Sequence, residues 1–299
     1  MAWEFEGLFD QAIEGGPEEQ ISFWRSIPSD IRVGKMGYRT RTTKAGPRLE
    51  AEIYPMYGRE KTGRLRAEKK NMTPEKVARL NMERSERHAV LLTEANFSEN
   101  DYHVTLTYKG ETPDYKRAKM DVRNWTDKLK RLRAKEGLEP LKYIGAIEGG
   151  TDGTRERIHI HIIVNGGINR EIMESLWGKG YANADRLRPD ENGLEAVARY
   201  IIKQSRTGKE KFKKRWFASR NLKQPKTRTS DTKVTNAKVR KIAGDMLNEA
   251  RAIMEKVYPG YEFTKCAVHG SDVVDGVYIR VVMRERKQGR GAMRGGGRW

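Results

Sequence analysis

The chain has 299 residues, and its 60 lysines and arginines exceed its 41 aspartates and glutamates to give a formal net charge of +19 at pH 7. A surplus of this size favours a polyanionic partner, above all nucleic acid. The single cysteine excludes an intramolecular disulfide and a cysteine-rich zinc site, and neither a secretion signal nor a membrane-spanning run is present, so we expect a cytoplasmic protein.

Residues 1–72 are predicted to form a basic N-terminal extension, because glycine, proline and charged residues interrupt every regular pattern in them. Tyrosines alternate there with basic residues, as at Tyr38 and Arg39. Aromatic rings among cations suit base stacking combined with phosphate contact, so both residues are candidates for DNA binding. A basic loop or hairpin without a DNA role explains the pattern equally well.

Residues 73–205 show regular patterns of both helix and strand. The strand at 143–148 and the strand at 157–164 flank a loop rich in glycine and aspartate, which is typical of a hairpin. We therefore predict an α+β domain with a central antiparallel sheet of four to five strands flanked by helices. Its predicted helices cover residues 73–92, 116–135, 169–177 and 194–205, and its predicted strands cover residues 102–108, 143–148 and 157–164.

The C-terminal third divides into three segments by composition. Residues 206–232 are basic and rich in serine and threonine, which predicts a linker or a DNA-facing loop. Residues 233–287 predict a small α/β unit with a long helix over 234–257 and a strand over 277–284. Residues 288–299 are rich in glycine and arginine and are predicted to be disordered.

The most specific pattern is the run Arg157-Ile158-His159-Ile160-His161-Ile162. On a strand, side chains two residues apart share a face, so His159 and His161 point the same way while the isoleucines enter the core. Two imidazoles on one rigid strand supply two nitrogen ligands for a single metal ion. A pair of half-exposed structural histidines is the alternative interpretation.

The strand at 143–148 adds a carboxylate to the same face. If this strand pairs antiparallel with the histidine strand, Glu148 comes close to His159. Glu148, His159 and His161 then form a set of two histidines and one carboxylate, which leaves open positions for water and substrate oxygens. Such mixed ligation suits Mn²⁺ or Mg²⁺ in a phosphoryl-transfer site, although zinc also accepts it.

Tyr200 and Lys203 lie one turn apart on the predicted helix 194–205 and therefore share a face. A tyrosine with a free pKa of about 10 is a poor nucleophile, and it needs a nearby cation or metal ion that favours the phenolate. Lys203 is placed to supply that cation or to hold a phosphate. Taken alone, such a pair is common in helices that have no catalytic function.

In their order along the chain, these motifs resemble the HUH endonuclease superfamily, in particular the rolling-circle replication initiators of phages and plasmids. The first family motif is similar to His103-Val104-Thr105-Leu106-Thr107-Tyr108, the second to His159-Ile160-His161, and the third to Tyr200-Ile201-Ile202-Lys203. Ala196 stands one helical turn before Tyr200, where the two-tyrosine branch has its second tyrosine. The chain is therefore similar to the single-tyrosine type, and how a second cleavage is made stays open.

The resemblance covers residues 73–205 and implies an HUH-type, RRM-like nuclease fold. It implies that Tyr200 attacks a phosphodiester of single-stranded DNA, which leaves a 5′-phosphotyrosine and a free 3′-hydroxyl, and that the reverse step rejoins ends. It implies a divalent ion, Mn²⁺ or Mg²⁺, on Glu148, His159 and His161. The substrate would be a hairpin or melted origin in a bacterial host, with the host helicase and DNA polymerase as partners. Basic residues expected to hold the strand are Arg155, Arg157, Lys211, Lys213, Lys214 and Arg215.

Other functions remain open from the sequence. A mobilisation relaxase or a single-strand transposase uses the same chemistry, but relaxases usually place the tyrosine before the histidines, and these transposases are shorter. A non-catalytic DNA-binding protein with structural histidines is a second alternative. An oxygenase with two histidines and one carboxylate is disfavoured by the charge of +19.

Overall fold

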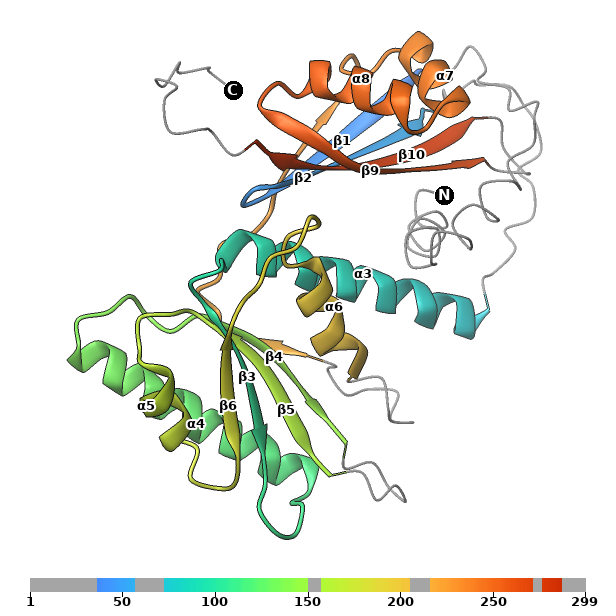
Figure 1. Ribbon diagram of the computed structural model, residues 1–299. Helices are drawn as coiled ribbons and strands as arrows, with labels where there is room; N and C mark the ends of the chain where they lie inside the picture. The colour runs from blue at the N-terminus through green and yellow to red at the C-terminus, as the bar shows by residue number, and fades with distance from the viewer. Residues whose placement is uncertain (1–36, 57–72, 150–156, 205–215, 271–275, 287–299) are drawn as a thin grey trace. The chain divides into compact units, whose positions relative to one another are not determined.

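The computed structural model describes residues 37–56, 73–149, 157–204, 216–270 and 276–286, and the chain divides into two compact units. One unit comprises Asn81–Pro225, and the other combines Met1–Leu80 with Lys226–Trp299. Each contains a five-stranded antiparallel sheet with helices packed on it (Figure 1). The protein is therefore α+β, as the sequence predicts, but it has two sheets rather than one.

The sheet of the Asn81–Pro225 unit carries the two histidines of the predicted site. Its strand order is β6-β3-β5-β4-β7, so the histidine strand β5 is central. The three predicted strands are confirmed as the middle of this sheet, whereas the short outer strands β6 and β7 were not predicted. The strands are β3 (Tyr102–Thr107), β4 (Tyr143–Glu148), β5 (His159–Val164), β6 (Ala182–Arg186) and β7 (Phe217–Ala218).

Helices cover both faces of this sheet. Ile158, Ile160 and Ile162 point into a core formed with α4 and α5, which lie on one face, while α6 and the C-terminal part of α3 lie on the other face (Figure 1). This placement confirms the alternation predicted for the histidine strand. The helices are α3 (Pro74–Asn96), α4 (Tyr115–Lys135), α5 (Arg170–Ser175) and α6 (Glu195–Gln204).

Helix α4 shows why the apolar pattern of the sequence was reliable here. Asp114 caps the helix by accepting a hydrogen bond from Arg117 N (2.6 Å). Its buried residues recur every three to four positions and include Trp125 and Leu129. The indole of Trp125 donates to Met173 O of α5 (3.2 Å), which ties the two helices of this face together.

The second unit is built on the sheet β8-β1-β2-β10-β9, with α7 and α8 packed on one of its faces (Figure 1). Leu49, Ile53 and Val281 of the sheet share an apolar core with Val239 and Met254 of the helices. The elements of this unit are β1 (Tyr38–Ala45), β2 (Arg48–Pro55), β8 (Lys226–Ser230), α7 (Asn236–Gly244), α8 (Asn248–Val257), β9 (Tyr261–Gly270) and β10 (Val277–Glu285).

This unit corrects the predicted domain organisation. β1 and β2 come from the predicted extension 1–72 and β8 comes from the predicted linker 206–232, yet all three belong to one sheet with the C-terminal strands. The charges that indicated exposed loops are buried in pairs. Glu50 accepts from Arg48 (2.8 Å) and from Arg280 (3.1 Å), all within the sheet.

The helix predicted over 234–257 is broken in two. Asp245 has an extended backbone, and its carboxylate accepts from Leu247 N (3.1 Å) and Asn248 N (2.9 Å), so the chain restarts as α8. β9 was not predicted because a register shift of its pairing with β10, between Val282 and Met283, disrupts its alternation. The tail 288–299 lies outside the described residues, and no described helix is long and apolar enough to cross a membrane.

Candidate functional site

The candidate site lies on the histidine face of the central sheet and draws on three neighbouring strands. β4 places Glu148 opposite His159. β3 places Thr107 opposite His159 and Thr105 opposite His161 on the other side. Because residues opposite each other in a sheet share a face, the register brings these five polar side chains together.

His161 is the most buried member of the set and is only 7% exposed. Its Nε2 lies 3.5 Å from Glu148 Oε2, and its Nδ1 lies 3.4 Å from the Thr105 hydroxyl. Burial, together with the neighbouring His103 and His159, lowers the pKa of His161 to about 4. The imidazole is therefore neutral at physiological pH and keeps a lone pair for a metal ion.

His103 is a member of the site to which the sequence assigned no role. Its ring stacks on that of His161, with centroids 5.5 Å apart and an interplanar angle of 22°. Burial lowers the pKa of His103, and among the described residues its buried Nε2 has no hydrogen-bond partner. The alternation of His103, Thr105 and Thr107 along β3 was the signal that could have placed them on the histidine face.

Helix α6 brings Tyr200 to the histidines. The Tyr200 ring lies 5.4 Å from the His161 ring in an edge-on arrangement (79°) and 6.2 Å from the His103 ring. Ala198 and Ile201 bury the other side of the helix in the core of this face. Tyr200 itself is 46% exposed, so its ring is accessible from solvent while it touches the site.

The start of α6 is fixed by a buried carboxylate of α3. Glu94 accepts a hydrogen bond from Leu194 N (2.8 Å) immediately before the helix begins. One turn into the helix, Arg199 pairs with Glu195 (3.0 Å) and with Glu86 of α3 (3.8 Å). These contacts hold the helix, and hence Tyr200, against α3 within the same unit.

The donor set fits a divalent ion in its chemistry, although the ligands do not converge. Within the described ranges, no three histidine, cysteine, aspartate or glutamate side chains are gathered as a metal-binding group. Glu148 and His161 nevertheless lie 3.5 Å apart, and His159 is opposite Glu148 on the same face. A carboxylate beside a neutral imidazole is the ligand type that divalent ions take.

Several predicted site residues lie outside the described part of the chain. Arg157 is described and exposed, two residues before His159. Lys203 belongs to α6, but its side chain is not among those described. The remaining basic candidates fall in the gaps 150–156 and 205–215, and they are Arg155, Lys211, Lys213, Lys214 and Arg215.

The two N-terminal candidates for DNA binding are corrected. Tyr38 is 2% exposed, and its hydroxyl accepts from Val277 N (3.2 Å), so its ring is not available for base stacking. It begins β1 on the face that packs against α7 and α8. Arg39 is engaged by Asp231 through two hydrogen bonds (2.6 and 2.8 Å), which raise its pKa.

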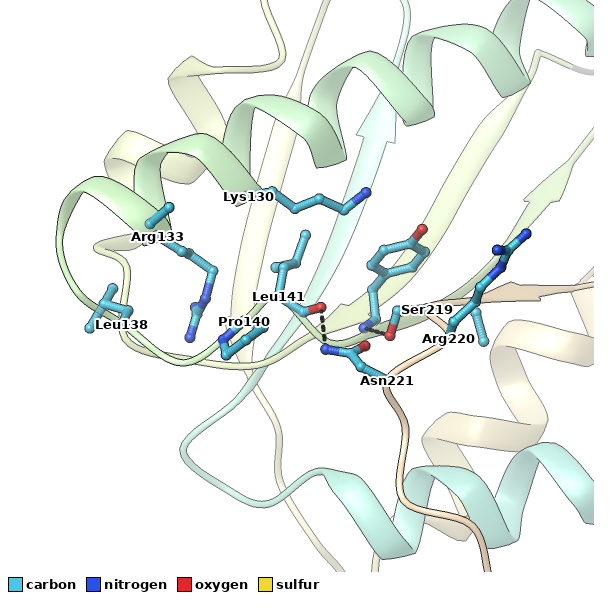
Figure 2. Close-up of a pocket in the computed structure, with 11 residues that line it drawn as sticks. Lys130, Arg133, Leu138, Pro140, Leu141, Ser219, Arg220 and Asn221 are labelled. Carbon is cyan, nitrogen blue, oxygen red and sulfur yellow. Dashed lines mark hydrogen bonds between the residues drawn. The ribbon is translucent and has the colours of Figure 1, made fainter.

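A cavity of about 600 Å³ opens elsewhere in this unit, between α4 and the segment after β7 (Figure 2). Lys130, Arg133 and Arg220 contribute to its lining, and Asn221 donates to Leu141 O (3.2 Å) at its rim. It adjoins the start of β4, whereas Glu148 ends that strand, about 17 Å further along at roughly 3.4 Å per residue. The cavity is therefore separate from the histidine site.

Comparison with known proteins connects the site to replication. Residues 101–205 match a family model described as a replication-associated protein of the ORF2 type. The matched segment contains Glu148, His159, His161 and Tyr200. Neither the curated proteins nor the solved structures that were compared gave a match. The family match supports a role in the initiation of replication.

Proposed function

We propose that this chain starts replication by nicking single-stranded DNA at an origin, with Tyr200 as the nucleophile. The observation that carries the proposal is the position of the half-exposed Tyr200 ring, 5.4 Å from the His161 ring on a face that also holds Glu148. The family match over residues 101–205 supports a replication role. The proposed class is a single-tyrosine HUH endonuclease that also rejoins ends.

The proposed step exchanges one phosphodiester for another. The Tyr200 oxygen forms a bond to the scissile phosphorus, and the bond from phosphorus to the 3′ oxygen breaks. The phenol gives up its proton, and the departing oxygen takes one up to become a 3′-hydroxyl. Because the number of phosphodiester bonds does not change, the step needs no nucleotide triphosphate, and its reversal joins DNA ends.

Each residue of the site has a proposed task. A divalent ion, Mn²⁺ or Mg²⁺, held by Glu148, His159 and His161 would polarise the phosphate as a Lewis acid. The Thr105 hydroxyl at His161 Nδ1 orients the imidazole so that Nε2 faces Glu148. Lys203, one turn after Tyr200, would stabilise charge on the phosphate or assist loss of the phenol proton.

The free 3′-hydroxyl would serve as the primer for a host DNA polymerase. The chain has no phosphate-binding loop of the helicase type, since the glycines of 58–64 lack a following Lys-Ser or Lys-Thr pair. A host helicase would therefore unwind the duplex. The basic stretch 209–215 and Arg157 are proposed to hold the single strand.

The test uses tiled single-stranded oligonucleotides from the DNA that encodes the chain, incubated with the full-length protein and Mn²⁺. A 5′-phosphotyrosine predicts that a 3′-labelled oligonucleotide shifts to the mass of a protein adduct in a denaturing gel. A 5′-labelled oligonucleotide should instead give a shorter free product that a DNA polymerase extends. Tyr200→Phe should abolish both products and leave binding nearly intact.

Tyr181→Phe is the matched control, because Tyr181 is an exposed tyrosine of the same unit and should keep the adduct. An adduct that persists in Tyr200→Phe and disappears in Tyr181→Phe would assign the nucleophile to Tyr181. Binding without any adduct in Mn²⁺ or Mg²⁺ would identify a non-catalytic DNA-binding protein. A product joined to a second DNA strand, with no extendable 3′ end, would favour a transposase.

A further inference from the structure

The loop before β6 places an exposed tyrosine on the histidine face. Thr107 donates its backbone N–H to Tyr181 O (2.8 Å), which continues the register in which Thr105 lies opposite Asn183. Tyr181 therefore lies opposite Thr107 and shares its face. It is 77% exposed, the most exposed of the large apolar side chains that the structure describes.

Tyr181 belongs to the same cross-strand row as two proposed metal ligands. Thr107 lies opposite His159, and His159 lies opposite Glu148, so the row crosses β6, β3, β5 and β4. Neighbouring strands are about 4.8 Å apart, which puts the Tyr181 backbone roughly 10 Å from that of His159. Stacked bases repeat about every 3.4 Å along a strand, so this distance corresponds to one to three nucleotides.

The backbone at Tyr181 is held tightly against the end of β3. A side chain at Gly180 would drive its Cβ into Thr107 O and within 2.6 Å of Lys109 N, so the close approach requires glycine. Lys109 donates to Lys179 O (2.9 Å), and the Lys179 ammonium lies 3.3 Å from Asp121. An exposed aromatic ring is ordinary by itself, but one on a fixed backbone is preorganised for a ligand.

The surroundings of Tyr181 suit a base better than a phosphate. Asn183 and Asp185, the next residues on this face of β6, are exposed, and the carboxylate of Asp185 repels phosphate. Lys179, two residues before Tyr181, is already paired with the buried Asp121. A neutral ring at an acidic edge therefore offers a stacking surface rather than a phosphate contact.

We propose that Tyr181 is the stacking platform for a base next to the scissile phosphate, and this inference rests on the proposed function. Stacking on Tyr181 would hold the strand across the row that leads to His159 and Glu148. The interaction uses the face of the ring and not its hydroxyl. It therefore positions the strand without choosing the base, and origin specificity comes from other contacts.

The experiment measures binding of the full-length Tyr200→Phe protein, which does not cleave, to the oligonucleotide of the tiled set that binds most tightly. A series of this oligonucleotide carries one abasic site at successive positions. One position should weaken binding about 5- to 150-fold, the range for loss of one stacked base. Adding Tyr181→Ala should weaken binding of the intact strand by a similar factor and remove the abasic penalty at that position alone.

Two further variants complete the test. Tyr181→Phe keeps the ring and should keep both the affinity and the abasic penalty. Ile172→Ala removes an exposed apolar side chain of α5, 48% exposed on the other side of the sheet, and should change neither. Equal abasic penalties with and without Tyr181→Ala at every position would overturn the proposal, as would a Tyr181→Phe protein that behaves like Tyr181→Ala.

The outcome separates this inference from the proposed function. A position-specific penalty that depends on Tyr181, in a chain whose unsubstituted form makes no adduct, retains the stacking platform and rejects nicking. Adduct formation with no dependence of binding on Tyr181 retains nicking and rejects the platform. Absence of single-strand binding rejects both.

Discussion

The buried, neutral His161 predicts a specific pH dependence of stability in the metal-free protein. Its pKa is lowered from 6.5 to about 4, chiefly by burial. The unfolded chain therefore takes up a proton on this residue at a higher pH than the folded chain does. The corresponding stability is fully present above pH 6.5 and is lost as the pH falls from 6.5 towards 4.

The size of the effect follows from the two pKa values. Between pH 7 and pH 5, the free energy of unfolding should fall by about 2 kcal/mol because of His161 alone. The groups that face His161 are Glu148, His103, His159 and Tyr200. The pKa of His103 is also lowered, so it adds a decrease of the same sign.

The assay is urea unfolding in EDTA at pH 7 and pH 5, for the wild type and for His161→Gln. Glutamine does not titrate, so the variant should lose about 2 kcal/mol less than the wild type across this interval, while His103 contributes to both proteins. Equal losses in the two proteins would refute the reasoning. They would mean that His161 is solvated or that Glu148 already keeps it protonated.

Three other outcomes are expected. EDTA should stop adduct formation and Mn²⁺ should restore it, and His159→Ala should weaken Mn²⁺ binding at least about 10-fold by calorimetry; undiminished binding would remove His159 from the ligand set. Trp125→Ala should lower the free energy of unfolding in urea by about 3–5 kcal/mol, because the indole is buried between α4 and α5, and a smaller loss would mean that the site collapses around the cavity. Neutralising four cations of the basic stretch should flatten the log–log salt dependence of single-strand binding by up to about three units without changing the rate on saturating DNA, and a lost rate with an unchanged slope would place the stretch in the active site. The four are Lys211, Lys213, Lys214 and Arg215.

The histidine sheet could be predicted because its signals are local. In β5, histidines and buried isoleucines alternate with a period of two, so one run of residues specifies both the strand and its faces. The glycine-rich loop then specified the antiparallel partner, and Glu148 is opposite His159 as expected. The contribution of His103 depends on the register between β3 and β5, and its stacking on His161 was therefore not predicted.

The second sheet could not be predicted from local patterns. β1 pairs with β8, as in the contact of Thr43 with Thr227 across 184 residues, and Tyr38 meets Val277 across 239. Strands joined over such separations leave no turn signature in the sequence. In addition, Glu50 and Arg280 are buried in the sheet as an ion pair, whereas the sequence pattern predicts that charges face solvent.

The nucleophile and the proposed metal ligands are carried by different elements, and this has a consequence for the reaction. Glu148 and His161 are fixed by strand register, whereas Tyr200 is placed by the packing of Ile201 and by the hydrogen bond from Leu194 to Glu94. A displacement of about 1 Å between reacting groups can cost roughly 100-fold in rate. The apolar contact between α6 and the sheet therefore sets the attack geometry in the proposed mechanism, although none of its residues touches the phosphate.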